Sequence, residues 1–218
     1  LLILIIDFFG IFQSLELKVL DFAFKLRGPT LGWMANNNIH EEESDIVIVD
    51  LDDESYRLIP WTYPYPRGDM WARVLENLSN AGAKVIVFDI EFIAKDQKSE
   101  YLKNVGKIRG FTPPTHGDIV FSNAIRNAKK NGTDVILASE IANEPTRVPP
   151  QYISIPNPAI MNSEPITGLT NIIEDKDGFM RRYFVFLPLA HDKDKWYQTI
   201  GIKAVHSYLS LPDDIVPI

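Results

Sequence analysis

The sequence contains no cysteine among its 218 residues. This absence excludes disulfides, cysteine-ligated zinc and thiol catalysis, although it does not fix the compartment, since many cytosolic and periplasmic proteins also lack cysteine. Basic residues are also in the minority, with 22 Lys and Arg against 29 Asp and Glu and a formal net charge of −7. We therefore expect no nucleic acid partner, because phosphate binding requires clustered Lys and Arg.

Common catalytic and cofactor motifs are missing as well. The sequence has no Gly-Lys phosphate loop, no Gly-x-Ser-x-Gly elbow and no dinucleotide fingerprint. The four histidines are scattered, with no pair at i, i+4: His40, His116, His191 and His206. We therefore expect a chain that is not an enzyme, with no catalytic residue, no metal and no cofactor.

An apolar run opens the chain. Residues 1–12, LLILIIDFFGIF, are apolar except for Asp7 and Gly10, but they are shorter than the ~20 residues that span a bilayer. No basic region precedes them and no small-residue cleavage site follows, so a complete signal peptide does not fit. We interpret the run as the end of a transmembrane helix; a core helix of a soluble domain is the alternative.

A heptad-like helix is predicted directly after this run. Apolar residues recur there at alternating spacings of three and four, at Phe12, Leu15, Val19, Phe22 and Leu26. We call these five positions the seam, because they could meet a second copy of the chain. A second stripe, at Leu17, Leu20 and Phe24, could pack on a domain. Gly28 and Pro29 end the helix.

The remainder predicts an α/β fold with a central mixed, largely parallel sheet flanked by helices. Residues 46–52 (IVIVDLD) and 85–92 (VIVFDIEF) are β-branched runs typical of strands buried on both faces, and the apolar period between them predicts a helix over 69–81. The three segments form a βαβ unit. The expected later elements are a helix over 118–131, a strand over 135–141, a strand over 179–189 and a helix over 196–209.

Two long connections separate these elements. Residues 93–117 carry five basic residues and are expected to form a solvated loop or, alternatively, a mobile cover over acidic strand ends. Residues 143–178 contain six prolines and are expected to form a surface excursion with short extended pieces.

Acidic residues follow both early strands. Asp50 and Asp52 end the first strand, Asp89 and Glu91 end the second, and parallel α/β sheets bind ligands beyond the carboxyl ends of their strands. The Asp-x-Asp pair superficially resembles that of haloacid-dehalogenase phosphatases, so a metal-dependent phosphohydrolase using Asp50 and Asp52 is one alternative. The pattern then departs from that family at Glu54, where a Thr or Val is expected. We favour acids that cap helices or pair with arginines such as Arg67 and Arg181.

Aromatic residues are densest between the first strand and the first helix. The cluster comprises Trp61, Tyr63, Tyr65 and Trp71, interleaved with prolines. We expect a rigid loop that plugs the top of the sheet, with a ligand cage as the alternative.

Together these segments form a more specific pattern. Their order and spacing resemble the CHASE domain of the second type, the cyclase/histidine-kinase associated sensing extracellular domain. The segments that carry the resemblance are, in chain order, LELKVLDFAFKLRG, IVIVDLDDESY, Trp61 with Tyr65, Pro66 and Arg67, AGAKVIVFDIEF, and Asp177 with Gly178, Arg181 and Arg182. The resemblance runs from about residue 12 to about residue 210. It implies an extracytoplasmic sensory input domain of a bacterial membrane receptor that controls a cytoplasmic nucleotide cyclase, histidine kinase or Ser/Thr kinase.

The resemblance and the residue patterns lead to one set of expectations. Residues 1–28 would form the end of a transmembrane helix and a juxtamembrane helix, 29–45 a linker, 46–212 the sensor domain and 213–218 the start of a connection to a following membrane segment. The domain would lie outside a bacterial inner or plasma membrane, in the periplasm or extracellular space. Its expected partners are the membrane through the N-terminal helix, a second copy and a small-molecule or protein signal. A passive spacer is the third alternative.

Ligand-binding candidates follow from the acids and the pattern positions. They are Asp50, Asp52, Arg67, Asp89, Glu91 and Arg181.

Overall fold

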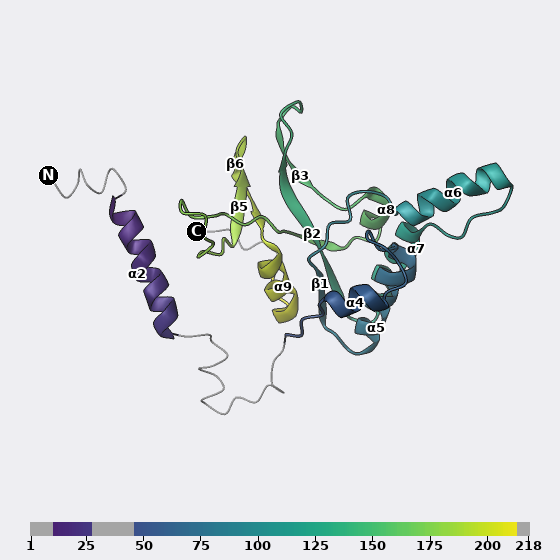
Figure 1. Ribbon diagram of the computed structural model, residues 1–218, viewed down its shortest axis with the longest axis horizontal. Coiled ribbons are helices and arrows are strands. Elements are labelled where there is room, and N and C mark those ends of the chain that lie inside the picture. The colour runs from purple at the N-terminus through teal and green to yellow at the C-terminus, as the bar shows by residue number, and fades with distance from the viewer. Residues whose placement is uncertain (1–10, 28–45, 213–218) are drawn as a thin grey trace. The chain divides into compact units, whose positions relative to one another are not determined.

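The computed structural model describes residues 11–27 and 46–212 (Figure 1). The chain divides into two compact units, Leu1–Leu58 and Ile59–Ile218, which are described separately. Residues 1–10 of the expected transmembrane helix, the expected linker 29–45 and the expected connection 213–218 lie outside the described residues, so the predicted domain boundaries stay predictions. Within the described ranges, no helix combines the length and the apolarity that crossing a bilayer requires.

The first unit contains α2 (Ile11–Arg27) and α4 (Asp53–Leu58). Helix α2 confirms the helix that the seam predicts. The seam residues whose side chains are described lie in solvent, with Val19 60%, Phe22 62% and Leu26 73% exposed. An apolar stripe with this spacing and exposure is suited to pairing with another helix.

The strand predicted over residues 46–52 is wrong. These residues form no strand, and the four side chains from Ile46 to Val49 are 64–86% exposed. A β-branched run expresses a preference for extended backbone, but a strand also needs a neighbouring strand to pair with. The βαβ unit that depended on this strand is therefore wrong as well.

A four-stranded mixed sheet forms the centre of the second unit, which confirms a mixed α/β fold. The long strand β2 (Asp134–Asn143) is its axis, with β1 (Val85–Phe88) and β4 (Ile166–Leu169) parallel to it on either side. The C-terminal end of β2 pairs antiparallel with β3 (Gln151–Ser154). The register aligns Phe88 with Leu137 at the end of β1.

Helices cover this sheet. The predicted helix over 69–81 is confirmed as a π-helical turn η2 (Arg67–Trp71) that continues into α5 (Ala72–Asn80), and the one over 118–131 as α7 (Gly117–Lys130). Helix α7 packs against α5, η2 and α8 (Pro158–Met161), while α9 (Ile200–Leu209) packs on β2 and β4. Period and end signals agreed for α5 and α7, which is why the sequence located these two helices.

Two predicted connections contain regular structure, and one predicted strand is shorter than expected. The predicted loop 93–117 includes a helix, α6 (Gln97–Arg109), and the predicted excursion 143–178 includes the core strand β4. The strand predicted over 179–189 is limited to β5 (Phe186–Leu189), which pairs with β6 (Asp192–Gln198). Trp196 therefore lies in a hairpin, and the last helix starts at Ile200.

An aromatic chain fills the core beyond β1. Ring centroids lie 4.9–6.2 Å apart along Tyr65, Trp71, Phe88, Phe92 and Phe121, mostly in edge-to-face contacts. Tyr65 and Trp71 are 4% and 7% exposed. The expected packing of the aromatic loop is thus confirmed for these two residues, whereas Tyr63 is 73% exposed.

Candidate functional site

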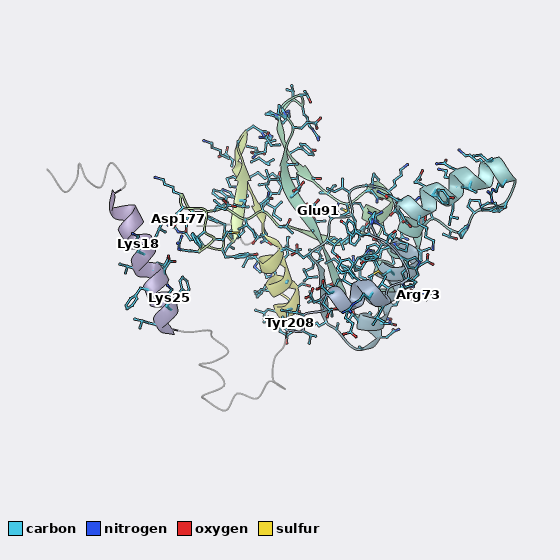
Figure 2. All side chains as sticks on the ribbon, viewed as in Figure 1. Lys18, Lys25, Arg73, Glu91, Asp177 and Tyr208 are labelled. Carbon is cyan, nitrogen blue, oxygen red and sulfur yellow. The ribbon has the colours of Figure 1, made fainter. Side chains whose placement is uncertain are left out.

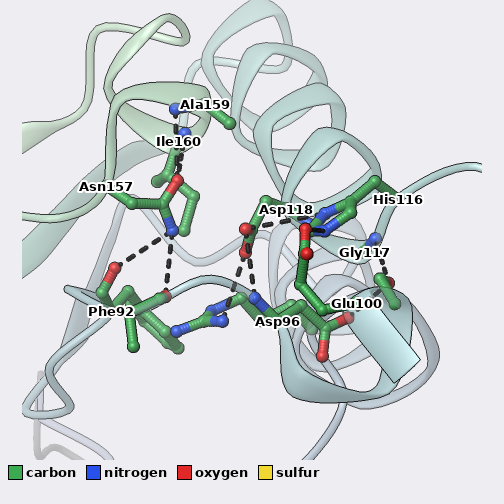
Figure 3. Close-up of polar contacts among 12 residues, drawn as sticks. Phe92, Asp96, Glu100, His116, Gly117, Asp118, Asn157, Ala159 and Ile160 are labelled. Carbon is green, nitrogen blue, oxygen red and sulfur yellow. Dashed lines mark hydrogen bonds and ion pairs between the residues drawn. The ribbon is translucent and has the colours of Figure 1, made fainter. Parts of the chain in front are cut away.

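Three segments meet beside the aromatic chain and form a buried polar cluster (Figure 3). They are η2, the loop that leaves β1, and the start of α7. The segments contribute Arg67, Asp96 and Asp118, which are 9%, 4% and 1% exposed. We call these residues, with Ser99, His116 and Gly117, the polar cluster.

Arg67 and Asp118 form the charged centre of the polar cluster. Arg67 Nη1 lies 3.2 Å from Asp118 Oδ1, and the guanidinium carbon lies 5.3 Å from the centre of the Phe92 ring. Removing two charges from water costs several kcal/mol each, so the attraction between them and the surrounding donors must offset that cost. Loss of either partner would leave the other charge buried and unpaired.

The backbone supplies one further donor to the Asp118 carboxylate. Its Oδ2 accepts a hydrogen bond from the Asp96 N–H at 3.2 Å, and its place in the first turn of α7 adds the favourable helix dipole. His116 caps the same helix, with Nδ1 accepting from the Asp118 N–H at 3.3 Å. Asp118 therefore connects η2, the β1 exit loop and α7 through one carboxylate.

A second chain of bonds attaches α6 to α7. Ser99 Oγ donates to Asp96 Oδ2 at 2.8 Å and accepts from the Gly117 N–H at 2.7 Å. With His116 Nδ1 acting as an acceptor, the opposite ring nitrogen donates to Glu100 Oε1 at 3.1 Å. This bond lowers the pKa of Glu100 below its ordinary value. The N-terminal end of α6 is thereby fixed to the polar cluster.

Two glycines allow this close approach. A Cβ at Gly117 would lie 1.9 Å from Asp96 Oδ2 and 3.1 Å from the Gly68 nitrogen, and one at Gly68 would lie 3.3 Å from the Gly117 Cα. The first distance is far inside van der Waals contact, so a side chain at Gly117 would displace Asp96. Position 117 therefore requires glycine, because there is no room for a Cβ atom.

Asn157, which precedes α8, binds the loop that leaves β1. Its Nδ2 donates to the carbonyl oxygens of Phe92 and Ala94 at 3.3 and 3.2 Å, while its Oδ1 caps α8 by accepting from the Ala159 N–H at 3.1 Å. The side chain is 94% buried, since Asn157 is 6% exposed. One amide therefore joins α8 to the strand exit.

One candidate residue, Glu91, lies close to Glu140, an acid that was not among the predicted site residues. Glu91 lies three residues beyond Phe88 and Glu140 three beyond Leu137, so the parallel register brings the two carboxyls side by side. Partial desolvation, then the charge and hydrogen bond of Glu140, and then Asp89 raise the pKa of Glu91 above its ordinary value. Two close carboxyls favour sharing a proton.

The candidate residues of the second unit have separate partners. Arg67 enters the polar cluster and lies over the Phe92 ring. Glu91 lies beside Glu140, and Arg181 binds Asp177. Asp50 and Asp52 belong to the first unit, and the ligand-binding roles of all six residues stay predictions. Figure 2 shows Glu91 and Asp177, the partner of Arg181, at separate places in the second unit. The sequence analysis missed Asp118, Ser99, Asn157 and Glu140; only the His-Gly-Asp start of α7, a capping signal, could have indicated one of them.

Asp52 has a structural role in the first unit. Its Oδ1 accepts from the backbone N–H and the hydroxyl of Ser55, at 2.8 and 2.7 Å, and these bonds lower the pKa of Asp52. This is the geometry of a helix N-cap at the start of α4. The premise of the phosphohydrolase alternative, that Asp50 and Asp52 end a buried strand, is wrong.

Arg181 also serves a local structure. It is bonded to Asp177 Oδ1 at 2.8 Å and Oδ2 at 3.0 Å, and lies 3.4 Å from Asp175 Oδ2. The bidentate contact lowers the pKa of Asp177. Gly178, with φ +80°, provides the left-handed residue of the turn between them. Within residues 11–27 and 46–212, no group of three or more His, Asp or Glu residues is arranged to hold a metal ion.

Fold and polar cluster together define a mixed α/β domain in which buried polar residues fasten its own segments to one another. A family model, the CHASE2 domain, matches residues 1–217, and the chain belongs to this family of extracellular sensory domains of signalling proteins. CHASE2 domains are extracytoplasmic, and the sensor domain is a non-catalytic module. Comparisons with curated proteins and with solved structures gave no match.

Proposed function

We propose that this CHASE2 domain is the input domain of a bacterial membrane receptor that controls a cytoplasmic nucleotide cyclase, histidine kinase or Ser/Thr kinase. The observation that carries the proposal is the match to the family over residues 1–217. The receptor would be held in the inner or plasma membrane by an N-terminal helix, with this domain in the periplasm or the extracellular space.

We propose further that the receptor is a homodimer that pairs through α2. The exposed seam residues Val19, Phe22 and Leu26 support this, because their spacing matches the contact stripe of paired helices. A signal received by the second unit, a small molecule or a protein, would alter the packing of the dimer. Helix α2 would carry a small shift toward the membrane.

Disulfide cross-linking tests this proposal, because the chain has no cysteine of its own. Phe22→Cys places a thiol on the seam, and Phe24→Cys places one on a second exposed aromatic position, about 200° around the helix; Phe22 is 62% exposed and Phe24 is 50% exposed. In membranes containing the full-length protein, mild oxidation should produce cross-linked dimers with Phe22→Cys, because paired Cα atoms within about 7 Å can be bridged. Phe24→Cys should remain largely monomeric.

Output activity provides the second readout of the same membranes. Oxidation of Phe22→Cys should change the cyclase or kinase rate, and a reductant should restore it. Equal cross-linking at both positions would contradict the seam. Cross-linking without any change in output would support a passive spacer.

A further inference from the structure

Helix α6 is the least buried long helix of the second unit. Of the 13 residues in Gln97–Arg109, only Gly106 is buried, and Figure 1 shows α6 projecting beyond α7. Its attachments are concentrated at its first turn, through Ser99, Glu100 and an ion pair between Lys98 and Asp69. Most of the surface of α6 is therefore exposed and available to a further partner.

That face carries an apolar stripe. Tyr101, Val105 and Ile108 are spaced at i, i+4 and i+7, which places them on one side of the helix. Tyr101 is 66% exposed and Ile108 is 85% exposed, while Val105 between them is half-buried. Single apolar residues on a surface are ordinary, but three in register on a projecting helix indicate an interaction surface.

The rest of the helix surface is mostly basic. At 100° per residue, Lys98 and Arg109 lie next to the stripe, Lys107 lies about 130° from it on the other side, and Lys103 lies on the opposite face. Lys98 pairs with Asp69, and the one acidic residue of the helix, Glu100, bonds to His116. This concentration of positive charge occurs in a chain of net charge −7. An apolar stripe on a helix whose polar face is rich in Lys and Arg is typical of helices that lie in the interface of an anionic membrane.

We propose that α6 binds an anionic phospholipid surface. Tyr101, Val105 and Ile108 enter the headgroup region, and Lys107 and Arg109 contact lipid phosphates. Charge complementarity selects lipid over a second copy of the chain, because no matching acidic stripe accompanies the basic one on α6. The proposal is independent of the receptor's output, since α6 would bind such vesicles whether or not a cyclase or kinase follows the domain.

A single fluorescent label on α6 tests the proposal. The chain has no cysteine, so Ile108→Cys accepts an environment-sensitive nitrobenzoxadiazole dye at one position. The dye reports on α6 even where residues 1–12 also attach the chain to vesicles. We expect a blue shift with phosphatidylglycerol vesicles and none with phosphatidylcholine vesicles. Salt at about 1 M, where the Debye length is about 3 Å, should reverse it.

Two charge reversals in matched helix positions sharpen the test. Lys107→Glu with Arg109→Glu removes the last-turn cations of α6, and Lys129→Glu with Lys130→Glu removes those of α7. Both changes oppose the helix dipole equally. The α6 reversal should weaken vesicle binding at least 25-fold, since each basic residue near an anionic surface contributes about fivefold. The α7 reversal should change it by less than about threefold.

Tyr101→Ser keeps every charge of α6. It tests the proposal separately if the charge reversal unfolds the helix. It should also weaken binding, because it removes apolar area from the stripe. The proposal is overturned if the dye does not respond to phosphatidylglycerol, or responds equally to both lipids. A shift that grows with protein concentration in the absence of vesicles would overturn it too, by assigning the face to a second copy.

Discussion

Arg67 and Asp118 form a buried ion pair. The Arg67 side chain is 10% exposed and the Asp118 side chain is 1% exposed. The arrangement is incomplete, because Arg67 Nε finds no hydrogen-bond partner among the described residues. Such pairs contribute little net stability over an apolar replacement of both partners, yet the loss of one partner is costly. Their effect is to specify how η2, the β1 exit loop and α7 meet.

Arg67→Met should destabilise the domain by about 3–5 kcal/mol, because it leaves the Asp118 carboxylate buried without its counter-charge. Urea unfolding followed by circular dichroism measures the change. Arg73→Met is the matched control, since Arg73 is exposed on α5 and should change stability by no more than about 0.5 kcal/mol. An equal effect of the two substitutions would refute the role of the ion pair.

Glu91→Gln should make the domain more stable at neutral pH. The pKa of Glu91 is raised in the folded state, so wild-type stability falls as pH rises from its ordinary pKa of 4.5 through the folded pKa. Glutamine does not ionise, so the variant avoids this loss. The gain in stability should be small, because the Glu91 side chain is exposed. It should be absent near pH 4 and reach its full size above the folded pKa of Glu91.

Thermal unfolding of both proteins across this pH range measures the gain. Glu76→Gln, at an exposed position of α5, controls for the loss of one negative charge. A Glu91→Gln advantage that is already present at pH 4, or one that Glu76→Gln reproduces, would rule out the carboxyl pair as its cause.

Elements with a strong period and clear ends were predictable from the sequence. Helix α7 has an apolar face, a first-turn Asp and last-turn lysines, and it forms within a residue of its predicted bounds. Strand β2 was equally well marked. In contrast, β4 is only four residues long, and the three apolar residues of the α6 stripe stand in a mostly polar segment that contains Gly106, so the pattern of each was too weak to identify the element from the sequence alone.

The contacts between distant segments of the candidate site were harder to predict from the sequence. Arg67 and Glu91 were both predicted as site residues, but their partners Asp118 and Glu140 lie 51 and 49 positions further along the chain. No local signal records such a pairing, because it arises from sheet register and helix packing. For the same reason residues 46–52 looked like a strand although they form none in the structure.

The whole molecule combines an exposed helical seam in one unit with a fastened α/β sheet in the other. The polar cluster and the Asn157 bonds join η2, α6, α7 and α8 at one end of the sheet. These shared side chains hold the four segments in one arrangement.

The coding sequence downstream of codon 218 tests the receptor proposal most directly. We predict that it encodes membrane-spanning helices followed by a nucleotide cyclase, a histidine kinase or a Ser/Thr kinase. A stop codon directly after this domain, or a continuation without membrane helices or any such output domain, would contradict the proposal.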